Sequence, residues 1–125
     1  MIIMEKAAKE IKELKGFLPR SIAYAGQINE EFAEGIAGLY KAIWEEREDG
    51  LSIKHKHLIV FAVACSSNNI QSAVKILERL HKFGATRTEI NDAMMLAAWT
   101  GGIQHFTDFS AAVLKEMERL GYQGC

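Results

Sequence analysis

Apolar side chains recur every three or four positions along most of the chain, and this spacing constrains the fold more than any other feature. One such set runs through residues 32–44 and another through residues 70–80. Residues at this spacing share one face of an α-helix, so each set predicts an amphipathic helix. Proline occurs once, at Pro19, and valine and threonine are sparse, which argues against a β-sandwich or barrel. We therefore expect an all-α, bundle-like domain.

Turn and capping residues divide the chain into about six or seven helices. The first is expected over residues 4–14, and a short irregular or helical stretch over 20–26. Asn29 is expected to cap a long helix that closes at Asp49-Gly50, and Ser52 to cap the next helix. That next helix contains the run 58–65, which is apolar nearly all round and should be the buried centre of the domain.

Polar residues 66–69 should form the turn of an αα-hairpin, whose second helix ends at Phe83-Gly84. Thr86 and Glu89 fit the capping-box pattern, which predicts a helix from Arg87 to about residue 99. A glycine pair at 101–102 then precedes the last amphipathic helix, which Gly121 ends.

Composition narrows the classes of partner. The chain has 125 residues, the size of a single domain, here 1–125. Its fifteen basic and sixteen acidic residues give a net charge of -1 without a basic stripe, so nucleic acid is not an expected partner. The apolar run 58–65 is much shorter than the ~20 residues of a membrane span, and no signal-peptide layout is present, so we expect a cytoplasmic protein without a membrane contact.

The cysteines, Cys65 and Cys125, lie far apart and belong to no CxxC or Cys/His cluster. The sequence therefore predicts two free thiols, with no disulfide framework and no zinc site. No cofactor is expected.

Three stretches of the second half, residues 51–64, 84–90 and 100–102, resemble the core of the AhpD-like/carboxymuconolactone decarboxylase family. The resemblance covers roughly residues 51–114. It implies an AhpD-like helical bundle and the homo-oligomers, trimers or hexamers, that are usual in that family.

The redox branch of this family has the signature Glu-x11-Cys-x2-Cys-x3-His, with a Gly-Ala turn eight residues later. This signature can be aligned to the chain from two anchors: by counting back from Gly84, or by counting forward from the Leu-Ser-x-Lys-x-Lys segment that precedes the motif. Both anchors give the same register without an insertion. The Glu position is His57, and the histidine position is Ile76. The two cysteine positions are Asn69 and Ser72.

In that branch the resemblance implies a peroxidase reaction with an attacking thiolate, a resolving thiol, and Glu and His as proton carriers. Asn69 and Ser72 cannot undergo that redox cycle. The decarboxylase branch keeps a histidine where this chain has Ile76, so it loses its acid-base group here as well. Whether the chain is an enzyme is therefore open from the sequence.

Three residues remain as candidates for a rebuilt catalytic site. Cys65 lies close to a helix N-terminus that can lower a thiol pKa, but it also fits a small buried core residue. His57 can act as a general base, or be a buried histidine bonded to a neighbour. His105 follows the glycine turn that helps to wall the family's pocket, and it also fits an ordinary surface residue.

The other histidines and aromatic residues have simpler interpretations. His55 is two positions from His57, on a different helix face, so the pair makes no metal site. His81 suits the C-terminal dipole of its helix. A metal site formed by His57, His81 and His105 lacks any close-spaced ligand pair, and no metal is expected. The residues Trp44, Trp99 and Tyr40 fit core or subunit contacts.

The leading hypothesis is a family member that keeps the helical fold but lacks the dithiol peroxidase machinery. A first alternative is an enzyme that uses Cys65, His57 and His105, either as a single-cysteine, peroxiredoxin-like peroxide reductase or for lactone or decarboxylase-type chemistry. A second alternative is a non-catalytic oligomer in which residues 66–72 line a small-molecule or subunit pocket.

Overall fold

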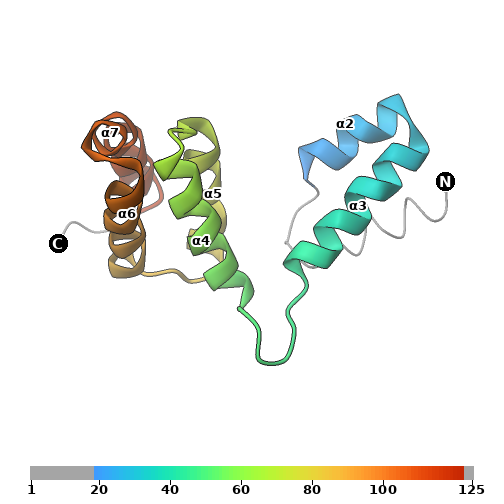
Figure 1. The fold of residues 1–125 in the computed structure, drawn as a ribbon, viewed down its shortest axis with the longest axis horizontal. Helices are drawn as coiled ribbons and strands as arrows, with labels where there is room; N and C mark the ends of the chain where they lie inside the picture. Colours follow the sequence, from blue (N-terminus) through green and yellow to red (C-terminus); the bar gives the residue numbers. More distant parts are fainter. Residues whose placement is uncertain (1–18, 123–125) are drawn as a thin grey trace. The chain divides into compact units, whose positions relative to one another are not determined.

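The computed structural model describes residues 19–122, which form six α-helices and no strand (Figure 1). The prediction of an all-α fold is confirmed. The helix expected over residues 4–14 and the second cysteine, Cys125, lie outside the described residues. None of the described helices is both long and apolar enough to cross a membrane.

The chain divides into two compact units, Met1–Glu48 and Asp49–Cys125, here called the N-terminal and C-terminal units. The expectation of a single domain over 1–125 stays a prediction.

The N-terminal unit contains the helical hairpin of α2 (Arg20–Ile28) and α3 (Glu30–Trp44). Asn29 ends α2 and caps α3, because its side-chain oxygen accepts a hydrogen bond from the Phe32 amide at 2.9 Å. The stretch after Pro19, expected to be irregular or helical, is therefore a regular helix. The small core of the hairpin contains Ile22, Ala37 and the partly buried Ile36 and Tyr40.

Helix α3 ends earlier than the sequence predicts. It stops at Trp44, the last residue of the apolar set, whereas the Asp49-Gly50 pair indicated a longer helix. The Arg47 guanidinium folds back and donates to the carbonyl of Ala42 at 2.6 Å and to that of Glu45 at 3.3 Å. These hydrogen bonds satisfy carbonyl groups that have no amide donor at the end of a helix. They therefore stabilise the helix end at Trp44.

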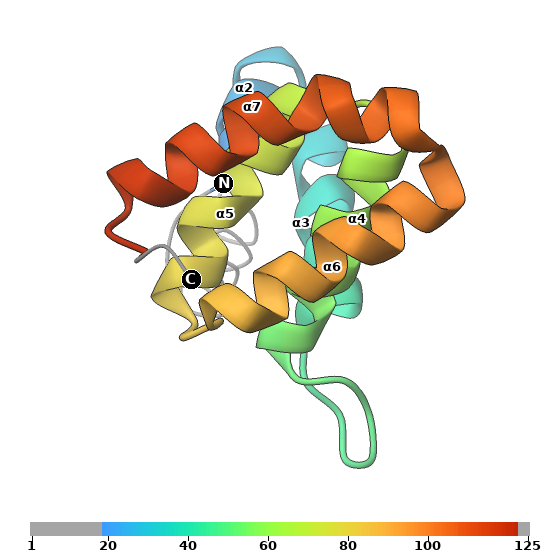
Figure 2. The same ribbon diagram turned by 90° about the vertical axis from the view of Figure 1, so that its left-hand side faces the viewer.

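The C-terminal unit packs four helices around one core (Figure 2). The helices are α4 (Ile53–Ser66), α5 (Ile70–Lys82), α6 (Arg87–Gly101) and α7 (Ile103–Arg119). Their fully buried side chains include Phe61, Leu77, Leu80, Ile90, Phe109, Val113 and Met117.

Helix α4 is central but is not buried on all sides. Ser52 caps it by accepting from the His55 amide at 3.2 Å, and the helix contacts α5, α6 and α7. However, Ile59 and Val63 are 48% and 59% exposed. The prediction of burial all round was wrong for this side because an apolar sequence does not tell which side the neighbouring helices leave uncovered.

The predicted capping box of α6 is present. The Thr86 hydroxyl accepts from the Glu89 amide at 3.1 Å, and the Glu89 carboxylate accepts from the Thr86 amide at 2.9 Å. The same carboxylate lies 3.0 Å from the Lys54 ammonium of α4. The Thr86 amide, and after it Lys54, lowers the pKa of Glu89.

We predict that Glu89→Ala lowers the free energy of unfolding by about 1 kcal/mol near neutral pH, because a cap and an interhelical pair are lost together. The folded-state pKa of Glu89 lies below its unfolded value. Its stabilisation is therefore complete above the unfolded pKa and disappears as the pH falls through the folded one. Chemical denaturation across this range should show the difference from wild type shrinking in acid. An equal loss from Glu118→Ala, an exposed acid on α7, would contradict this account.

Candidate functional site

The turn between α4 and α5 brings two of the four family-motif positions together. Asn69 is the N-cap of α5, and its side-chain oxygen accepts from the Ser72 amide at 3.4 Å. The turn is closed by the Asn69 amide, which donates to the Ala64 carbonyl at 2.8 Å. Asn68 has a φ of 59°, a left-handed conformation that asparagine tolerates better than most residues. Positions 69 and 72 are thus adjacent at a helix N-terminus.

Cys65 lies one turn before this cap and faces the core. Its side chain has no exposed surface, and burial raises the pKa of its thiol to about 12. Because only the thiolate is a good nucleophile, a group with this pKa is almost entirely in its unreactive form at neutral pH. The observed environment is that of a small core residue.

His57 is also buried, with 1% of its surface exposed. Its Nδ1 donates to the Ile53 carbonyl of the same helix at 2.8 Å, and its ring centroid lies 5.0 Å from that of Phe83. His57 therefore lies beside the end of α5, where Phe83 follows the last helical residue.

His105 lies at the opposite end of α4. Its Nδ1 donates to the Ser66 carbonyl at 2.7 Å, and the side chain is half-buried. This bond places the hydrogen of the neutral ring on Nδ1, which leaves Nε2 with a lone pair. His105 can therefore accept a proton without breaking its contact with α4.

The structure does not gather the three candidate catalytic residues. His57 precedes Cys65 by eight residues on α4, which corresponds to roughly 12 Å along a helix axis. His105 is bonded to Ser66, the residue after Cys65, so it is at the Cys65 end of α4 and far from His57. A catalytic role for these three residues stays a prediction.

The remaining predicted residues are similarly dispersed. Ile76 is partly buried and packs against the core of the C-terminal unit. The His81 ring makes an edge contact with Tyr122 at a centroid distance of 5.2 Å. Within residues 19–122, no group of three His, Cys, Asp or Glu side chains is arranged to hold a metal ion.

A close backbone contact joins α6 to the end of α4. A Cβ placed on Gly101 would lie 2.5 Å from the Ser66 carbonyl oxygen and 2.8 Å from its Cα. Only glycine fits here, because the atoms in the way are backbone and cannot rotate aside. The sequence indicated a chain break at the glycine pair, but not that Gly101 itself belongs to the helix.

Two surface grooves on the C-terminal unit were not predicted from the sequence. One, of about 260 Å³, lies between α4 and α6. The other, of about 590 Å³, lies between α5 and α7, with Val74 and Ala112 among its lining residues and charged residues of α7 around it. His57, Cys65 and His105 line neither of these grooves.

Residues 30–116 match the model of the carboxymuconolactone decarboxylase family. The chain belongs to this family. The matched region begins at the start of α3, so it extends the resemblance seen at residues 51–114 into the N-terminal unit. No curated protein and no solved structure shows a significant match to the chain.

For a member of the carboxymuconolactone decarboxylase family, the geometry at Asn69 is informative. The redox branch, as the resemblance implies, places its first cysteine at this position, and here the position is a helix N-terminus. In this predicted register, position 69 lies in a setting that would favour a thiolate. The amide side chain that occupies it performs a different task, which is to cap α5.

We predict that Gly101→Ala destabilises the protein by about 1 to 3 kcal/mol, because the new methyl group forces the end of α4 away from α6. Gly35→Ala is the matched control, since no heavy atom outside its own helix lies within 4 Å of that position. It should leave stability unchanged or raise it slightly, because alanine favours a helix. Thermal unfolding measures both, and a Gly101→Ala protein as stable as wild type would disprove the close contact.

Proposed function

We propose that this member of the carboxymuconolactone decarboxylase family does not carry out the dithiol peroxidase cycle of the family's redox branch. The proposal rests on the structural role of the side chain at position 69. This side chain caps α5 and is hydrogen bonded to the amide of residue 72. An amide and a hydroxyl at the two cysteine positions cannot form a sulfenic acid or resolve it to a disulfide.

The buried thiol does not replace the missing pair. Cys65 has no exposed surface and a pKa of about 12. To react, a peroxide must reach the sulfur atom, and the thiol must be ionised to a thiolate that can attack the O–O bond. The buried, protonated thiol of Cys65 meets neither condition. The buried state of Cys65 supports a structural role.

The proton carriers of the cycle are also replaced. His57 stands at the glutamate position, and its Nδ1 is engaged with the Ile53 carbonyl in a buried site. Ile76 stands at the histidine position and has no group that carries a proton. The same residue argues against a decarboxylase mechanism that relies on a histidine there.

A second candidate function is acid-base chemistry on a lactone or carboxylic acid, with His105 as the proton acceptor. The favouring observation is the bond from Nδ1 to the Ser66 carbonyl, which orients the ring of this half-buried histidine and leaves Nε2 basic. It is a weaker candidate because His57 and Cys65 do not join His105 in one site.

The first candidate is tested by exposing Cys125→Ser protein, in which Cys65 is the remaining thiol, to hydrogen peroxide and to an organic hydroperoxide. We expect no peroxide consumption above buffer and no loss of the thiol, which should react with a thiol reagent only after denaturation. Cys65→Ser in the same background is the thiol-free control. Peroxide consumption that requires Cys65, with loss of its thiol, would overturn the proposal.

The second candidate is tested by following the decarboxylation of carboxymuconolactone at neutral pH. If His105 accepts the proton, His105→Gln should reduce kcat by roughly 100-fold or more. His55→Gln is the matched control, since His55 is an exposed histidine that bonds to Ser52 at 2.7 Å. Absence of turnover by the wild-type protein would eliminate this candidate and leave the first one intact.

A further inference from the structure

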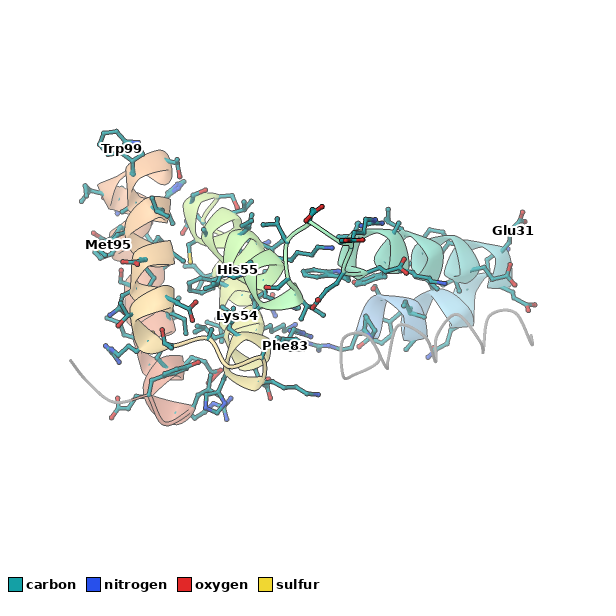
Figure 3. The ribbon with its side chains drawn as sticks, turned by 90° about the horizontal axis from the view of Figure 1, so that it is seen from below. Glu31, Lys54, His55, Phe83, Met95 and Trp99 are labelled. Carbon is teal, nitrogen blue, oxygen red and sulfur yellow. The ribbon has the colours of Figure 1, made fainter. Side chains whose placement is uncertain are left out.

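We draw no further inference here: the strongest candidate, the exposed apolar side chains of α4 and α6 that include Met95 and Trp99 (Figure 3), together with the groove between these two helices, carries nothing because nothing in the structure shows what covers this face.

Discussion

The carboxyl end of α4 is the junction on which the C-terminal unit depends. The backbone of Gly101 passes so close to Ser66 that a methyl group does not fit between them. Four residues later in the chain, the ring of His105 donates to the carbonyl of the same serine. The ends of α4 and α6 and the first turn of α7 are thus joined at one residue, and the α4–α5 turn begins immediately after it.

This junction supports the proposal that the chain keeps the family's helical scaffold without the dithiol chemistry. The α4–α5 turn is closed by backbone bonds to Ala64 and Cys65, and the helix after it begins with its own side-chain cap. Neither feature needs a thiol. Asn69 supplies the cap that α5 requires, and Cys65 fills a space in the core. In the proposed register, the residues at the motif positions therefore leave the packing of the helices satisfied without supplying the thiols of a dithiol cycle.

Local signals in the sequence were sufficient to predict much of the fold. The capping box of Thr86 and Glu89, the Asn29 and Ser52 caps, and the turn after Ser66 depend on residues near one another in the chain. Each of these occurs where the pattern placed it. The end of α3 was less predictable, because the Arg47 side chain that folds back onto the helix follows no helical spacing.

Features that depend on contacts between distant residues could not be read from the sequence. Which side of α4 is exposed, and whether Trp99 is exposed, depend on where α6 lies. Apolar spacing indicates only that a helix face favours burial against some other element. The bond between His105 and Ser66 joins residues 39 positions apart, and no sequence motif predicts it. The same limit applies to the candidate site: the register located Asn69 and Ser72, but their proximity and the separation of His57 from His105 required the packed helices.

The central proposal is that the scaffold is intact and that the chain lacks dithiol chemistry because of the side chains at the motif positions alone. The most direct test is to place cysteines at both positions, Asn69→Cys and Ser72→Cys, in a Cys65→Ser, Cys125→Ser background, and to titrate the thiols with hydrogen peroxide. The account predicts that the pair loses both thiols to an intramolecular disulfide, with one thiol ionising below its ordinary pKa at the N-terminus of α5. Two thiols that remain reduced or oxidise only between molecules would contradict it.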